Sequence, residues 1–126
     1  MVAHGKKVWA LRGAISVERN DAQSILSATA ELLRAVIARN NLDREDLISC
    51  IFTVTEDLDA AFPAQAAREL GLTAVPLLCA REIPVPGSAP RIVRLLLHYY
   101  GPPEVQPQHV YLGEARALRE DLAGAQ

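Results

Sequence analysis

The order of strand-like and helix-like segments is the feature that most limits the folds open to this chain. Residues 8–17 alternate as a strand does. A helix is predicted after Asn20 or Asp21, because apolar residues then recur at three- and four-residue spacing until Asn40. Residues 48–55 are dense in β-branched side chains, which is typical of a buried strand. Two strands therefore flank one helix.

The next part of the chain repeats this order and then becomes rich in strands. Pro63 suits the first turn of a helix over residues 63–70, and Gly71 stands where a left-handed cap would end it. Residues 75–80 predict a third strand. Residues 91–100 favour a fourth, because they contain valine, isoleucine and two tyrosines.

A loop must separate these last two strands. Residues 84–90 hold three prolines and a glycine, which forbid regular pairing, so we expect a hairpin around them. Facing residues of an antiparallel hairpin have a constant index sum, and a turn near Ser88 would pair Glu82 with Arg94. An acid and a base would then be neighbours. A structural ion pair at a sheet edge explains such a pair equally well.

The length of the chain bounds its organisation. A chain of 126 residues fits one domain with one site, so we assign residues 1–126 to a single domain. We expect an α+β fold in which a mixed sheet carries two main helices. Residues 109–112 add a short strand. Residues 1–7 form an N-terminal extension, and residues 114–126 form a polar tail with weak helical character.

Composition argues against several partners. A net charge of −2 argues against nucleic acid, because phosphate binding normally leaves a strongly basic face. No apolar run reaches the roughly 20 residues that span a bilayer, so we expect no membrane partner. No signal-peptide core follows the N-terminal lysines, and we expect a cytoplasmic protein. Cys50 and Cys79 lack a CxxC partner and are expected to be reduced thiols.

Two arginines interrupt apolar strands. An arginine inside a strand is costly to bury unless an anion meets it, so Arg12 and Arg94 each predict a carboxylate of the protein or of a ligand. Glu82 can neutralise only one of them well. Tyr111 adds a hydroxyl that needs a partner if it is buried. The surplus positive charge predicts a pocket for an anionic small molecule.

Other catalytic patterns do not occur in the sequence. His4, His98 and His109 show neither HxxxH nor HExxH spacing, so no metal site is expected. There is no G-x-S-x-G elbow and no glycine-rich phosphate loop. Cys79 has no identifiable histidine partner, so a covalent nucleophile is not expected either.

Several short segments, in their order and spacing, are similar to one enzyme family. They are Leu-Arg-Gly-Ala at 11–14, Ala-Phe-Pro-Ala at 61–64, His-Val-Tyr-Leu at 109–112 and Leu-Arg-Glu-Asp-Leu at 118–122, with Cys79, Glu82 and Arg94 between them. On these residues the chain resembles the monofunctional chorismate mutases of the pseudo-α/β-barrel class. The resemblance covers nearly the whole chain and is more specific than any one short motif.

The resemblance implies an activity and an assembly. Such enzymes convert chorismate to prephenate by an intramolecular Claisen rearrangement, in phenylalanine and tyrosine biosynthesis, and they need no cofactor. The chain would assemble as a homotrimeric pseudo-α/β barrel, with sites in the clefts between subunits. A unimolecular rearrangement has no nucleophile to activate and needs a compact conformer and matched charge, which arginine supplies.

The resemblance also implies the site residues. Arg94 would donate to the ether oxygen of the breaking bond, and Glu82 would accept a bond from the ring hydroxyl. Arg12 and Tyr111 would bind substrate carboxylates. The adjacent subunit would supply Phe62, Ala64 and Arg68, and the wall and entrance of the pocket would be completed by Leu77, Leu78, Cys79, Leu118 and Arg119.

The chain departs from its apparent relatives at Gln65, where some place lysine, and at Gln108 and Glu120 near the tail. Two other functions remain open. A trimeric small-metabolite-binding or regulatory module could use the same clefts, because a fold does not fix a function. An imine or enamine hydrolase would need an activated water, for which Glu82 has no obvious partner base.

Overall fold

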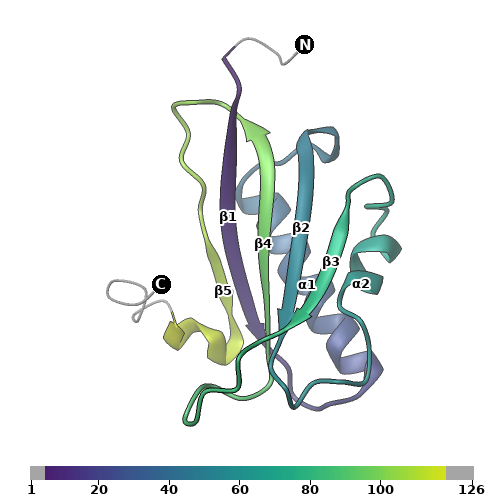
Figure 1. Ribbon diagram of the computed structural model, residues 1–126. Coiled ribbons are helices and arrows are strands. Elements are labelled where there is room, and N and C mark those ends of the chain that lie inside the picture. The colour runs from purple at the N-terminus through teal and green to yellow at the C-terminus, as the bar shows by residue number, and fades with distance from the viewer. Residues whose placement is uncertain (1–4, 119–126) are drawn as a thin grey trace.

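The computed structural model describes residues 5–118, which form a five-stranded sheet with its two α-helices on one side (Figure 1). The strands are β1 (Lys7–Ser16), β2 (Leu47–Val54), β3 (Leu77–Arg81), β4 (Ile92–Gly101) and β5 (Val110–Leu112), in the spatial order β3-β2-β4-β1-β5. β4 pairs antiparallel with β1 and β2, while β3 and β5 run parallel to β2 and β1. A mixed sheet with two helices confirms the predicted α+β class.

The helices begin and end near the predicted residues. In α1 (Ala22–Arg39) the Asp21 side chain caps the first turn by accepting from the backbone N–H of Ser24 at 2.7 Å. The short α2 (Ala64–Glu69) is followed by Gly71, whose φ of 93° is left-handed as the predicted cap requires. Two 3-10 turns, η1 (Arg44–Asp46) and η2 (Gly113–Ala117), complete the fold. None of the helices within residues 5–118 is long and apolar enough to cross a membrane.

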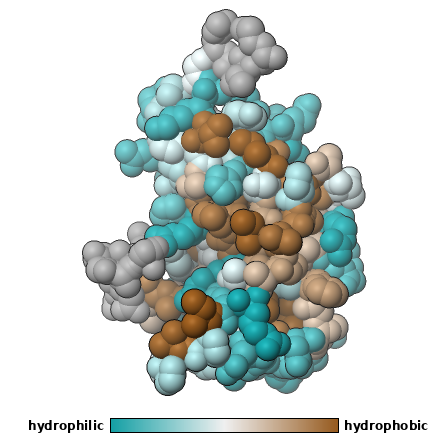
Figure 2. All heavy atoms as spheres, viewed as in Figure 1, coloured by the Kyte–Doolittle hydropathy of each residue, from teal (hydrophilic) through white to brown (hydrophobic). Residues whose placement is uncertain are grey.

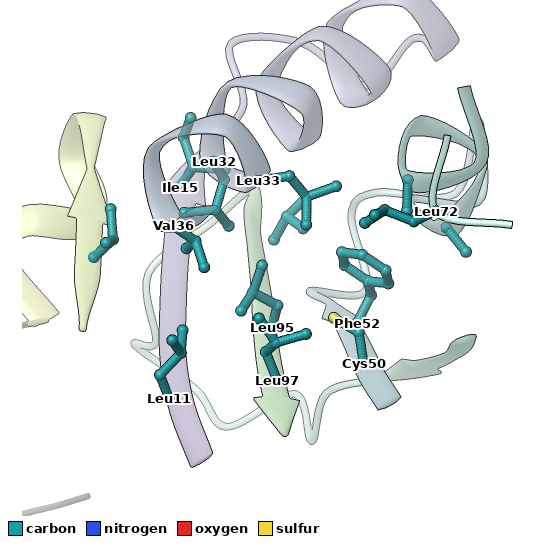
Figure 3. Packing of buried hydrophobic residues seen from close by; sticks show 14 of the residues in the cluster. Leu11, Ile15, Leu32, Leu33, Val36, Cys50, Phe52, Leu72, Leu95 and Leu97 are labelled. Atoms are coloured by element: carbon teal, nitrogen blue, oxygen red, sulfur yellow. The ribbon is translucent and has the colours of Figure 1, made fainter. Parts of the chain in front are cut away.

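α1 crosses one face of the sheet and buries the core against it (Figures 1 and 3). The core joins side chains of the helix to alternate residues of the three central strands, including Leu32, Leu33 and Val36 of α1 with Leu11, Phe52, Leu95 and Leu97 of the sheet. Gly13 permits this close approach, because a Cβ there would lie 3.2 Å from Leu32 Cδ1 and 3.3 Å from the Val110 carbonyl oxygen. We call this side the helix-covered face.

The predicted hairpin around residues 84–90 is wrong. β3 pairs in parallel with β2, and β4 lies on the opposite edge of β2. The reason is the connection through α2, which makes β2, α2 and β3 a β-α-β unit, and strands joined by such a crossover pair in parallel. The index-sum rule applies only to strands that pair directly, so it did not apply here.

The other side of the sheet, which we call the open face, is not covered by α1 or α2 and is turned towards the viewer in Figures 1 and 2. Figure 2 shows apolar side chains gathered over the middle of this face. Strand alternation places Val8 of β1 and Leu78 of β3 on it, and they are 51% and 61% exposed. The same alternation places Arg12 and Arg94 there.

Candidate active site

A row of cross-strand neighbours on the open face brings predicted site residues together. Tyr111 of β5 lies beside Ala14 of β1, Ala14 lies beside Arg94 of β4, and Arg94 lies beside Thr53 of β2. Paired residues point to the same face of a sheet, so these four side chains share one side. The small Ala14 is fully buried between Tyr111 and Arg94.

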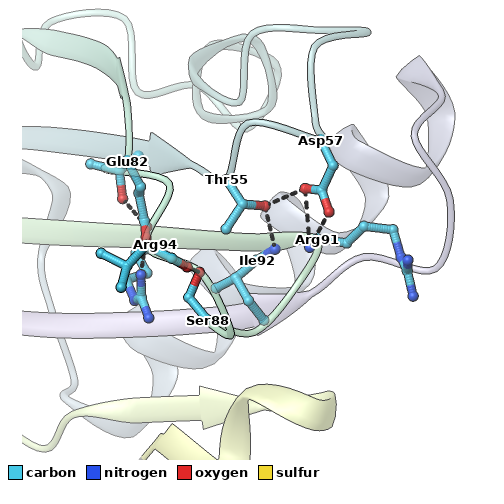
Figure 4. A network of polar contacts seen from close by, with 9 residues as sticks. Thr55, Asp57, Glu82, Ser88, Arg91, Ile92 and Arg94 are labelled. Atoms are coloured by element: carbon cyan, nitrogen blue, oxygen red, sulfur yellow. Dashed lines mark hydrogen bonds and ion pairs between the residues drawn. The ribbon is translucent and has the colours of Figure 1, made fainter.

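Glu82 follows β3 and contacts Arg94 on this face (Figure 4). Its backbone N–H donates to the Val54 carbonyl at 2.9 Å, which extends the pairing of β3 with β2. One carboxylate oxygen accepts from Arg94 Nη1, and the other accepts from the Thr53 hydroxyl at 2.6 Å. The expected neighbourhood of Glu82 and Arg94 is therefore confirmed, although it is reached across β2 rather than through a hairpin.

The exposure of this pair leaves room for a ligand. The Glu82 side chain is 15% exposed and the Arg94 side chain 40% exposed. A guanidinium has five N–H donors, so the bond to Glu82 leaves others that can reach a bound anion. The charge-assisted contact also holds Arg94 in one orientation before a ligand arrives. The arrangement can therefore present fixed positive charge to an oxygen that becomes negative.

A second polar network fixes the start of β4 just before Arg94 (Figure 4). Both carboxylate oxygens of Asp57 accept from the backbone N–H of Arg91, at 3.1 and 3.0 Å. The Thr55 hydroxyl donates to Asp57 and accepts from the N–H of Ile92. Arg91 has a φ of 49°, a left-handed conformation that costs a non-glycine residue roughly 1–2 kcal/mol, and these bonds help to offset it. The network sets where β4 begins.

Arg12 lies on the same face, opposite Leu96 of β4. Its backbone N–H donates to Nδ1 of His109 at 2.9 Å. Burial lowers the pKa of His109 from its usual 6.5, and the positive charge of Arg12 lowers it further. The neutral imidazole is therefore the form that faces Arg12 near pH 7.

The start of the predicted tail packs beside this row. Ala14, Ile92 and Ala115 form a small buried cluster, and Tyr111 and Leu118 pack against it. Leu118, which is expected in the pocket wall, therefore packs beside the cluster that contains Ala14 of the row. Arg119, expected at the entrance, lies outside the described residues.

The remaining predicted residues lie away from the row. Phe62, which precedes α2, is 70% exposed, and within α2 Ala64 is buried and Arg68 exposed. Phe62 lines a hollow of about 540 Å³ that also includes Cys79. Leu77 and Cys79 pack against the core on the helix-covered face, whereas Leu78 faces the open side. One chain therefore does not bring the α2 residues to Arg94.

Within residues 5–118, neither the cysteines nor the possible metal ligands form a second site. Burial raises the pKa of Cys50 to about 12, with a further contribution from Cys79, so its thiol stays protonated at neutral pH and is a poor nucleophile. Across residues 5–118, no three His, Cys, Asp or Glu side chains gather as metal ligands would. The chemistry of the described site thus rests on arginine, carboxylate and hydroxyl groups.

The sequence analysis assigned no role to Thr53, Thr55 or Asp57, whose hydrogen bonds support Glu82 and the start of β4. One signal could have found the two threonines, because they fall at alternate positions of the predicted strand at residues 48–55 and so share its polar side. Asp57 gave no such signal. Its partner Arg91 lies beside it only because β4 follows β2 in the sheet.

Comparison with known proteins agrees with this geometry. The family described as chorismate mutase type I matches residues 8–122. Chorismate mutase AroH of Thermus thermophilus is 51% identical over 121 residues, which cover 94% of this chain and 99% of that protein. Chorismate mutase AroH of Bacillus subtilis is 38% identical over 115 residues, covering 90% and 91%.

A solved structure leads to the same family. A chorismate mutase from Clostridium thermocellum matches with a TM-score of 0.83 and 45% sequence identity, over 86% of this chain and 98% of that one. The fold is thus shared with a chorismate mutase of known structure. The chain belongs to the type I chorismate mutases.

Proposed function

We propose that the chain catalyses the Claisen rearrangement of chorismate to prephenate on the open face of its sheet, with Arg94 as the electrostatic catalyst. The observation that carries this proposal is the placement of Arg94, which is partly exposed, bonded to Glu82 and set in one row with Tyr111. Membership of the type I family supports the reaction. The enzyme is an isomerase of aromatic amino acid biosynthesis, as its family implies.

The mechanism follows from the residue types. As the carbon–oxygen bond of chorismate breaks, its ether oxygen gains negative charge, and Arg94 donates to that oxygen. Glu82 accepts from the ring hydroxyl, while Arg12 and Tyr111 bind the carboxylates and hold the compact reactive conformer. No proton needs to move and no covalent intermediate forms. The catalysis needs no cofactor, because the bonds rearrange within one molecule.

Magnitudes indicate how the work is divided. An acceleration of about a million-fold requires roughly 8 kcal/mol off the barrier. One preorganised donor aimed at a developing oxyanion supplies about 3–4 kcal/mol of that. Holding chorismate in the compact reactive conformer would supply the remainder, about 4–5 kcal/mol. Arg94 would thus lower the barrier more than any other single residue. Arg12, Tyr111 and Glu82 would together hold the substrate in its reactive conformer.

We also propose that the active unit is a homotrimer, arranged as a pseudo-α/β barrel with sites between subunits. Phe62, Ala64 and Arg68 do not reach Arg94 within one chain, so a neighbouring subunit would supply them. The apolar side chains of the open face offer a surface for that contact (Figure 2). Leu77, Leu78, Cys79 and Leu118 would form or support the wall of each site, with Arg119 near its entrance.

A cytoplasmic location fits the chemistry of the cysteines. Cys50 and Cys79 are free thiols on the neighbouring strands β2 and β3. A reducing compartment maintains such thiols, whereas secreted proteins more often oxidise theirs. We therefore propose that the enzyme acts in the cytoplasm.

The test is a chorismate assay combined with subunit mixing. Purified protein is mixed with chorismate, and the loss of chorismate absorbance and the formation of prephenate are followed. Arg94→Ala and Arg68→Ala are then dissociated, mixed in equal amounts and reassembled. Each variant alone is expected to be weakly active, and random trimers of the two should regain about a quarter of the wild-type activity, because that share of clefts combines both intact arginines.

The outcomes separate the parts of the proposal. Binding without turnover in the wild type would favour a small-metabolite-binding module. Turnover without recovery in the mixture would contradict sites shared between subunits. Reassembled Arg94→Ala alone is the control, since it undergoes the same treatment but has no intact cleft.

A further inference from the structure

The parallel pairing of β1 with β5 stops just short of Arg12. Gly13 pairs with Val110, and in a regular parallel ladder the Arg12 N–H would next bond to the carbonyl of Gln108. That carbonyl instead accepts from Asn40 Nδ2 at 2.9 Å, and the Gln108 N–H donates to Asn40 Oδ1 at 2.7 Å. The side-chain amide of Asn40, at the end of α1, thus bonds both backbone groups of Gln108, and the Gln108 carbonyl does not pair with β1.

The imidazole of His109 occupies the position that the carbonyl leaves. Its Nδ1 accepts from the Arg12 N–H at 2.9 Å, which is ordinary hydrogen-bond geometry. A neutral imidazole that accepts at Nδ1 carries its proton on Nε2. The side chain of His109 therefore continues the ladder by one bond, at the residue whose guanidinium the proposed mechanism uses.

We infer that His109 is a positioning residue, whose neutral imidazole holds the backbone of Arg12 where its side chain can bind a carboxylate of the substrate. This inference rests on the proposed function, since the carboxylate contact of Arg12 is part of it. The opposite edge of β1 is fixed by its long ladder to β4, with Arg12 opposite Leu96. On the β5 edge, His109 accepts from the Arg12 N–H. The contact of Asn40 with Gln108 anchors the backbone next to His109 to the end of α1.

The bond depends on the charge of His109. A protonated imidazole has donors at both nitrogens and cannot accept from the Arg12 N–H. Burial and the charge of Arg12, which acts from β1, both favour the neutral ring, while the adjacent Asn40–Gln108 pair is uncharged. The native pKa lies below the unfolded value of 6.5, so the stabilisation is complete above pH 6.5 and is lost as the pH falls through the native pKa.

Two variants separate the acceptor from the ring. His109→Asn keeps an acceptor near the position of Nδ1 but does not titrate, whereas His109→Phe keeps a ring and has no acceptor. Val105→Ala is the matched control on the same loop, because Val105 is 55% exposed. The full-length proteins are assayed for kcat and KM with chorismate, and the amide of Arg12 is followed by 15N NMR and hydrogen exchange from pH 5 to 8.

We expect His109→Phe to raise KM about threefold to tenfold, the value of one net hydrogen bond, with kcat changed by less than about twofold. His109→Asn should restore KM. The Arg12 amide should shift with pH in the wild type, with a midpoint below 6.5, and should not shift in His109→Asn. Val105→Ala should match the wild type in every measurement.

An unchanged KM in a folded His109→Phe variant would overturn the inference, as would an Arg12 amide that is insensitive to both substitutions. If His109→Phe does not fold, the comparison of the wild type with His109→Asn across the pH range decides the question alone. If the wild type does not convert chorismate, the proposed function fails. The NMR measurement still decides whether His109 holds Arg12.

Discussion

Phe52 and Thr53 are adjacent in β2 but face two different environments. Phe52 points to the helix-covered face and is fully buried among the side chains of α1 and the sheet. Thr53 points to the open face, where it donates to the carboxylate that contacts Arg94. Two consecutive residues of one strand therefore have different roles, because one packs in the core and the other hydrogen-bonds at the candidate site.

The difference gives a physical reason for placing the proposed site on the open face. A guanidinium on the helix-covered face would need an anion of the protein for compensation and could not be reached by a ligand. On the open face Arg94 is fixed by one carboxylate and is still 40% exposed. The two faces therefore have different roles. The helix-covered face supplies the packing that holds the sheet against α1, and the open face uses the resulting rigidity to orient charged side chains.

Phe52→Ala tests the packing side of this comparison and has the largest expected effect on stability. Removing a fully buried phenylalanine should lower the free energy of unfolding by about 3–5 kcal/mol, because a cavity remains next to α1. Urea unfolding at a fixed protein concentration measures the loss, and kcat of the protein that stays folded should change little. A loss below about 1 kcal/mol would contradict the assigned role of this face.

Thr53→Val tests the polar side at the neighbouring residue and should have a smaller effect. The substitution keeps the shape of the side chain but removes the hydroxyl that donates to Glu82. We expect the free energy of unfolding to change by less than about 1.5 kcal/mol, and kcat/KM for chorismate to fall about threefold to tenfold. Thr53→Ser is the control that keeps the donor. Equal loss of stability in Thr53→Val and Phe52→Ala would remove the distinction between the faces.

Most of the elements were predictable because their signals are local. Capping by Asp21, the periodic apolar positions of α1 and the glycine after α2 all act within a few residues. The pairing of the strands was less accessible. Loop length and composition suggested that β3 and β4 pair, but the choice of β2 as partner of both depends on the crossover through α2 and on the packing of the whole sheet.

The site divides along the same line. Arg12 and Arg94 stood out because a charge within an apolar strand requires a partner wherever that strand lies. The residues that support these arginines did not stand out in the sequence. The contacts of Thr53 with Glu82, and of His109 with Arg12, join segments that only the sheet order brings together. The sequence therefore indicated the charged residues of the candidate site. The structure added the residues whose hydrogen bonds hold them in place, such as Thr53 and His109.

The most direct test of the central claim, that Arg94 on the open face carries the catalysis, is kcat for chorismate in Arg94→Ala and Arg94→Lys. Circular dichroism and sedimentation should first show that both variants keep the fold and assembly of the wild type. We predict that Arg94→Ala lowers kcat by roughly 10²–10³-fold, as the loss of one oxyanion donor does. Arg94→Lys should also be strongly impaired, because lysine keeps the charge but not the planar fork. Near-normal kcat in a folded Arg94→Ala variant would contradict the claim.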